Sequence, residues 1–131
     1  MVNVYSLKKD GNTQLTANFS VKEFKCHDGS DPVFINPLLP MVLQAMRAQV
    51  NKKIIILSGY RTSYHNTKEK GAEFSQHLYG AAADIYAPGM TTAELASVAE
   101  GIMPTWGGIG VYAKSGFVHV DVRPDKSRWS E

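Results

Sequence analysis

This sequence has a single cysteine, no long apolar run and no large excess of charge of one sign. The single cysteine, Cys26, cannot form an internal disulfide, so the fold does not depend on an oxidising compartment. The formal net charge is only +2 and the longest basic runs are Lys8–Lys9 and Lys52–Lys53, which predicts no nucleic-acid partner. No apolar run approaches the length of a membrane span, and the first residues lack the pattern of a secretory signal. We therefore expect a monomer without a signal peptide or a membrane partner.

Length and composition favour one domain over residues 1–131. The 131 residues suffice for one continuous core, because 44% of them are hydrophobic and no linker or repeat divides the chain. Two segments, 38–50 and 92–102, carry apolar residues at helical spacing, and both begin with a capping signal. The first signal is Asn36 followed by Pro37, and the second is a capping box that begins at Thr91. A third capping box predicts a short helix after Ser20.

Short apolar segments between and after these helices predict strands. They cover residues 54–57, 81–86, 108–112 and 117–122. A four-residue loop joins the last two, which must therefore pair as an antiparallel hairpin. We expect a turn at Asp10–Asn12 between two extended pieces, and a surface loop over 62–76 that could contain one helical turn. Together these elements predict a small α+β fold with a central antiparallel sheet flanked by helices.

A histidine and a carboxylate lie close together in the segment SQHLYGAAAD, residues 75–84. Gly80 allows the backbone between His77 and Asp84 to bend, and the alanines leave room beside an ion. Asp84 stands in an otherwise apolar segment, and a buried carboxylate needs a partner such as a cation. This pattern predicts two metal ligands. The alternative is that Asp84 caps or pairs at the surface while His77 occupies a loop.

A second histidine, His119, lies in the expected strand 117–122. Because strand side chains alternate, one face carries the valines Val118, Val120 and Val122. The opposite face carries Phe117, His119, Asp121 and Arg123. An ordinary half-solvated edge strand would show the same alternation. Combined with His77 and Asp84, however, His119 completes a set of two imidazoles and one carboxylate. Such a set leaves zinc a fourth position for water, which indicates a catalytic site.

Three motifs resemble those of the M15 zinc peptidases: Ser58-Gly59-Tyr60-Arg61-Thr62, Ser-x-His-x-x-Gly-x-Ala-x-Asp at residues 75–84, and Val118-His119-Val120-Asp121. The chain is most similar to the D-alanyl-D-alanine carboxypeptidase branch, which includes small bacteriophage and prophage enzymes, over about residues 18–129. The resemblance implies the fold shared with the amino-terminal signalling domain of hedgehog proteins. It also implies Zn²⁺ as the cofactor, with His77, Asp84 and His119 as its ligands.

The chain departs from this family at one position. Many relatives carry an acidic general base three residues before the last zinc histidine, where this chain has Gly116. Asp121 is the replacement candidate, because it shares a strand face with His119 and could reach a water held on the metal. The alternative is that Asp121 orients His119 or pairs with Arg123.

Arg61 is the second catalytic candidate. It follows a buried strand and the turn at Gly59, so its guanidinium could bind a substrate carboxylate or stabilise the oxyanion that forms during attack. The resemblance supports this role, while a solvated loop arginine is the alternative. Ser75, the first residue of the histidine motif, is a further candidate for substrate binding.

The resemblance implies a peptidase that cleaves the stem peptide of peptidoglycan, at its terminal D-alanine or at an internal bond. A non-catalytic module of the same fold, which binds the cell wall or a protein, is the alternative that Gly116 keeps open. Because no export signal is evident, we expect a protein that reaches the bacterial cell wall as a phage or prophage lysin or on a phage particle.

Overall fold

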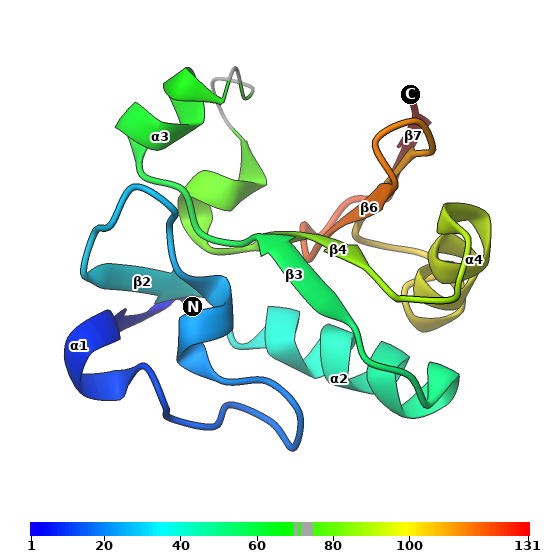
Figure 1. Cartoon of the computed structure of the whole chain (residues 1–131). Helices are drawn as coiled ribbons and strands as arrows, with labels where there is room; N and C mark the ends of the chain where they lie inside the picture. Colours follow the sequence, from blue (N-terminus) through cyan, green and yellow to red (C-terminus); the bar gives the residue numbers. More distant parts are fainter. Residues whose placement is uncertain (70, 72–74) are drawn as a thin grey trace.

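The computed structural model describes residues 1–69, 71 and 75–131. Within this part of the chain, five strands form one sheet in the order β3-β4-β6-β5-β7 (Figure 1). The strands are β3 (Ile55–Ser58), β4 (Ala82–Tyr86), β5 (Gly108–Tyr112), β6 (Phe117–Asp121) and β7 (Ser127–Ser130). The helices near the sheet are α2 (Leu38–Val50), α3 (Ser63–Lys68), α4 (Thr92–Ile102) and the 3-10 helix η2 (Gln76–Tyr79). The predicted small α+β fold is confirmed.

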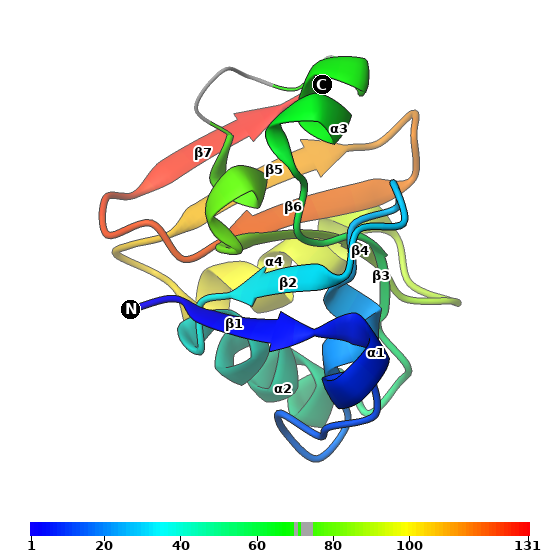
Figure 2. The ribbon, with the colours of Figure 1, turned by 90° about the vertical axis from the view of Figure 1, so that its left-hand side faces the viewer.

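Neighbouring strands of this sheet pair antiparallel, except that β7 runs parallel to β5. Figure 2 shows the β5 and β7 arrows side by side with the same direction, and β6 opposed to them. The hairpin of β5 and β6 was predicted, but β7 was not. Its sequence, Ser127-Arg128-Trp129-Ser130, is short and has no alternation of apolar residues.

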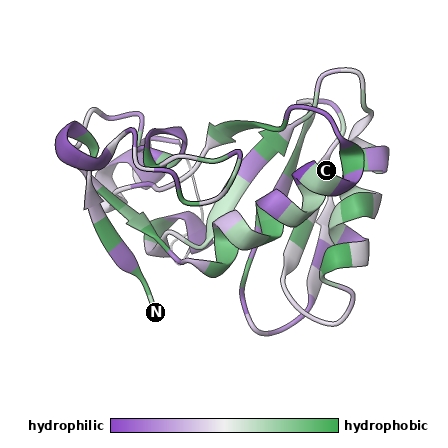
Figure 3. Cartoon of the chain, turned by 90° about the horizontal axis from the view of Figure 1, so that it is seen from below, coloured by the Kyte–Doolittle hydropathy of each residue, from purple (hydrophilic) through white to green (hydrophobic). Residues whose placement is uncertain are grey.

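Helices α2 and α4 cover one face of the sheet, and η2 and α3 lie over the other (Figures 1 and 2). The strand residues that meet α2 and α4 form the hydrophobic core, among them Ile85, Ile109, Val118 and Val120, which are at most 3% exposed. Seen from the side of these helices, α2 and α4 carry interleaved apolar and polar residues (Figure 3). Because strand side chains alternate, His119 and Asp121 project to the opposite face.

The amino-terminal part adds an antiparallel pair, β1 (Asn3–Ser6) with β2 (Pro32–Ile35), and two short helices, α1 (Leu7–Asp10) and η1 (Val21–Phe24). The expected turn at Asp10–Asn12 is present, since the Thr13 N–H donates to the Asp10 carbonyl oxygen at 2.8 Å. The residues just before it are not extended as expected, because a helical turn occupies Leu7–Asp10. The Ser6 hydroxyl accepts a hydrogen bond from the Lys9 N–H, and the Asp10 carboxylate accepts one from the Ser6 N–H. These local bonds stabilise the helical turn over an extended chain.

The predicted helix starts are confirmed. The Asn36 carboxamide oxygen accepts a hydrogen bond from the Leu38 N–H at 3.0 Å, and capping boxes begin at Ser20 and Thr91. Residues 62–76 were expected as a surface loop with room for one helical turn. They contain α3 and the start of η2, while residues 70 and 72–74 lie outside the described residues. No helix of the described ranges is long and apolar enough to cross a bilayer.

Gly80 links η2 to β4 and so joins the segments that carry His77 and Asp84. Its φ of 66° lies in the left-handed region, and a Cβ there would overlap the Phe34 carbonyl group. The Gly80 carbonyl in turn accepts a hydrogen bond from the Asn36 N–H at 2.9 Å. The bend that brings these two segments together therefore requires glycine.

We expect Gly80→Ala to lower the free energy of unfolding by at least ~1–2 kcal/mol, the cost of a left-handed L-residue, with the steric overlap adding to it. Gly101→Ala is the matched control, because Gly101 lies within α4 and its Cβ would meet open space. That change should stabilise the protein by about 0.5–1 kcal/mol. Urea unfolding followed by circular dichroism measures both, and equal stability of the two variants would contradict the role given to Gly80.

Candidate metal centre

One transverse row of residues crosses all five strands of the sheet. Ser58 pairs with Asp84, Asp84 with His119, His119 with Gly110, and Gly110 with Trp129. Residues paired across neighbouring strands project to the same face, here the face opposite α2 and α4. The strand register therefore places Asp84 beside His119, although 35 residues separate them in the chain.

His77 reaches this row from η2. The Ser75 hydroxyl accepts a hydrogen bond from the His77 N–H at 3.2 Å, which caps η2. The His77 side chain is fixed by a 2.7 Å contact between its Nδ1 and the Gly59 carbonyl oxygen. Because a carbonyl can only accept, Nδ1 carries the proton and Nε2 is left with a lone pair. That Nε2 lies 3.3 Å from Asp84 Oδ1.

His119 is held in the complementary tautomer. Its Nε2 lies 2.7 Å from Asp121 Oδ2, and its Nδ1 lies 3.0 Å from Asp84 Oδ1. Donation from Nε2–H to Asp121 leaves the lone pair of Nδ1 directed at Asp84. Two imidazole lone pairs and a carboxylate oxygen thus face one another.

Such an arrangement needs a cation at its centre. The ligand atoms of His77, Asp84 and His119 all lie within 4.8 Å of one another, and the three residues are 2%, 7% and 8% exposed. Three acceptors buried together repel unless a proton or a metal ion lies between them. Two nitrogens and one carboxylate oxygen form a donor set that zinc prefers in open sites. The residues present therefore fit a zinc ion.

In the absence of a metal, protons reduce the repulsion among the three buried acceptor atoms. Burial opposes the charge on Asp84, but the hydrogen bonds from His119 and His77 outweigh it and hold the Asp84 pKa well below its ordinary value. Burial likewise opposes protonation of His119, yet its contacts with Asp121 and Asp84 raise the His119 pKa. A metal ion that enters the site must displace this proton, as is usual for histidine ligands.

Asp121 does not face the metal position. Its two oxygens accept hydrogen bonds from His119 Nε2, the Gly108 N–H, and the main chain, Nε and Nη2 of Arg123. Burial raises the Asp121 pKa, but the bonds from His119 and Arg123 outweigh it and hold the pKa well below the ordinary range. A carboxylate that is fully buried and accepts from five N–H groups has little capacity left for a proton from water. These contacts fit the orienting role better than the role of general base.

Arg61 approaches Asp84 from the other side. Its Nη2 lies 3.3 Å from Asp84 Oδ2, its Nε donates to the Ser58 hydroxyl at 3.1 Å, and its Nη1 donates to Asn66 Oδ1 at 3.4 Å. The guanidinium is therefore fixed against the oxygen of Asp84 that does not face the histidines. Its binding of substrate stays a prediction.

A pocket of about 540 Å³ opens above the three ligands. Its lining includes Arg61, Ser75 and Gln76 together with the aromatic residues Tyr112, Phe117 and Trp129. The structure thus brings Arg61 and Ser75 to the same pocket as the predicted metal ligands. From the sequence, Trp129 was expected to line a substrate groove or to pack in the core, and Tyr112 had no predicted role. Both line the pocket, Trp129 through the unpredicted β7 and Tyr112 through β5.

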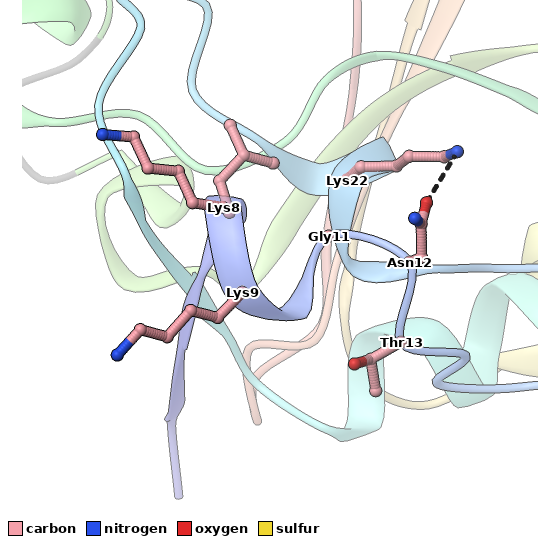
Figure 4. A pocket seen from close by; sticks show the side chains of 7 residues that line it. Lys8, Lys9, Gly11, Asn12, Thr13 and Lys22 are labelled. Atoms are coloured by element: carbon pink, nitrogen blue, oxygen red, sulfur yellow. Dashed lines mark hydrogen bonds between the residues drawn. The ribbon is translucent and has the colours of Figure 1, made fainter.

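A second hollow of about 450 Å³ lies near α1 and η1 (Figure 4). Lys8, Lys9 and Lys22 line it, but Figure 4 shows the first two amines directed away from the third. The Lys22 amine donates to the Asn12 carboxamide oxygen at 3.1 Å. Because the three charges diverge, they do not define an anion site.

Three buried ligands on one face of the sheet, lining a pocket, define a candidate metal centre that a substrate could reach. The family model of peptidase M15 matches residues 14–121, and the chain belongs to this family of zinc-dependent metallopeptidases. The match includes all three predicted ligands as well as Arg61 and Asp121. No curated protein matches the chain.

We expect His77→Ala and His119→Ala each to weaken zinc binding by more than ~100-fold. Mutation of a residue that only hydrogen-bonds to a metal ligand typically weakens it by ~10–100-fold. His27→Ala is the matched control, because His27 is exposed and contacts the Leu57 carbonyl oxygen, away from the ligand group. Metal analysis after dialysis should find one zinc per chain in the control. One zinc per chain in either ligand variant would contradict the assignment of that histidine as a zinc ligand.

Proposed function

We propose that this chain is a zinc peptidase that cleaves the stem peptides of peptidoglycan, at the terminal D-alanine or at an internal bond. The observation that carries the proposal is the His77–Asp84–His119 group at the floor of a pocket that a peptide could enter. Zinc held by such ligands lowers the pKa of a bound water toward ~7 and polarises a peptide carbonyl. Membership of the M15 family supports hydrolysis of a peptide bond.

The chain's own residues hold and orient the reacting groups. Asp121 fixes the His119 ring through Nε2, and Arg123 keeps Asp121 ionised by a bidentate contact at 2.6–2.7 Å. Arg61 lines the pocket beside Asp84, where its remaining N–H groups would bind a substrate carboxylate or the developing oxyanion. Ser75 lines the same pocket and would contact the peptide.

A proton acceptor other than Asp121 is then required. Among the described residues that line the pocket, the carboxylates outside the ligand group are Glu69 and Glu131. Either would take the proton from water and transfer it to the departing amine, as a general base and then a general acid. Comparison of Glu69→Gln with Glu131→Gln in the assay below would separate them.

Purified peptidoglycan incubated with the zinc-loaded protein should yield new free amines, detected by mass spectrometry. Release of free D-alanine identifies a carboxypeptidase, and fragments with a new amino terminus identify an endopeptidase. His119→Ala should abolish both products. The absence of any product from the wild-type protein would favour a non-catalytic wall-binding module.

We expect Asp121→Asn to weaken zinc binding by about 10–100-fold, as loss of an orienting carboxylate does, with turnover largely retained once zinc saturates the site. Zinc titration and turnover at saturating zinc test this. The reverse result, unchanged zinc affinity with turnover reduced by about a hundredfold or more, would make Asp121 the general base.

The route by which the protein reaches the wall, as a phage or prophage lysin or on a particle, belongs to the same proposal. It follows only from the resemblance of the motifs to small phage enzymes. Lysis of bacteria on expression together with a membrane-permeabilising phage protein, and no lysis without it, is the expected behaviour of a lysin of this kind.

A further inference from the structure

The side of the pocket that faces β5, β6 and β7 is aromatic. Tyr112 and Phe117 stack with ring centroids 4.6 Å apart and planes 12° apart. The Trp129 indole lies next to them, because its Nε1 donates to the Tyr112 hydroxyl at 2.9 Å. All three side chains line the pocket above the metal ligands, and we call them the aromatic wall.

Trp129 is held directly beside the metal ligands. Its ring centroid lies 5.1 Å from that of His119, and the Arg123 guanidinium lies 5.4 Å from the indole. The indole occupies the space above Gly110, where a Cβ would overlap the ring. The parallel pairing of β7 with β5 puts Trp129 opposite Gly110. The position of the indole is thus fixed by the sheet as well as by its hydrogen bond.

The charge nearest to the wall is already neutralised. Both nitrogens of Arg123 that contact Asp121 lie within 2.7 Å of its oxygens, and Asp121 is fully buried. The indole N–H is also satisfied by Tyr112. The three rings themselves offer no ionic partner, so a charged side chain placed flat against them would lose hydration, whereas an apolar side chain would gain from burial.

We propose that the aromatic wall binds an apolar side chain of the peptide residue adjacent to the bond that is cut. The proposal rests on the proposed zinc peptidase function, and it assigns the specificity of the site to Tyr112, Phe117 and Trp129. Because the Trp129 indole lies 5.1 Å from the His119 ring, a substrate that extends from the metal past His119 would contact the indole. The wall therefore selects uncharged, apolar residues on this side of the scissile bond.

Small hydroxamates test this assignment, because the hydroxamate group binds zinc while its substituent samples the pocket. Calorimetry on the zinc-loaded chain would compare acetohydroxamate, benzohydroxamate and the monohydroxamate of succinate. We expect benzohydroxamate to bind at least about tenfold more tightly than acetohydroxamate, from apolar burial. The succinate derivative reports on Arg61 instead of the wall, so any gain that it shows over acetohydroxamate should persist unchanged in Trp129→Ala.

Two variants remove parts of the wall. Trp129→Ala should abolish the preference for benzohydroxamate while acetohydroxamate still binds. Phe117→Ala should reduce the preference and does not change a ring packed against His119. It is therefore the variant to use if Trp129→Ala loses zinc or stability. Trp106→Phe is the matched control, since Trp106 packs against the core and is absent from the pocket lining. It should keep the full preference.

The outcomes distinguish failure of this inference from failure of the proposed zinc peptidase function. Failure of the wild-type chain to take up zinc would overturn the metal site and the wall together. Binding of acetohydroxamate with no preference for benzohydroxamate would overturn the wall alone. A preference that persists unchanged in both Trp129→Ala and Phe117→Ala would also overturn it.

Discussion

The structure depends on one electrostatic constraint, the convergence of three acceptor atoms in a buried place, which needs a proton or a metal ion between them. Neither imidazole can relieve it by changing tautomer. The Gly59 carbonyl requires the proton of His77 on Nδ1, and Asp121 requires that of His119 on Nε2. The lone pairs that remain point at the same oxygen of Asp84, and only a cation satisfies all three. The hydrogen bonds around the ligands thus preorganise the site before any metal arrives.

Each carboxylate of the centre has its own arginine. Arg61 contacts the outer oxygen of Asp84, and Arg123 contacts both oxygens of Asp121. The two pairs lie on opposite sides of the His119 ring, which touches both carboxylates. Because each negative charge has a cationic partner, the centre retains the positive charge that a bound metal contributes.

Much of this arrangement was predictable from local sequence patterns. The helix caps at Asn36 and Thr91 depend on side chains two or three residues from the backbone groups that they bind, so they can be found without the fold. The ligand set was predictable because His77 and Asp84 lie in a compact motif, and because His119 lies on the expected strand with alternating valines.

The rest depends on contacts between distant segments. The short β7 follows no sequence pattern of its own and forms because the Arg128 guanidinium binds carbonyl groups of Met103, Trp106 and Gly107. The contacts that decide the role of Asp121 could not be predicted from the sequence. They depend on the bidentate geometry of Arg123 and on the pairing of Gly108 with Asp121 across neighbouring strands. Two glycines alternating on β5, Gly108 and Gly110, were the available signal that bulky groups lie across that strand.

The position of β7 at the edge of the sheet has an evolutionary consequence. Metal retention depends on β4 and β6, which are interior strands, whereas the indole beside the metal comes from a strand with a single neighbour. Edge strands tolerate replacement and insertion better than interior ones, because fewer ladder bonds constrain them. A lineage built on this scaffold could therefore exchange the substrate that it recognises while its reaction chemistry is inherited unchanged.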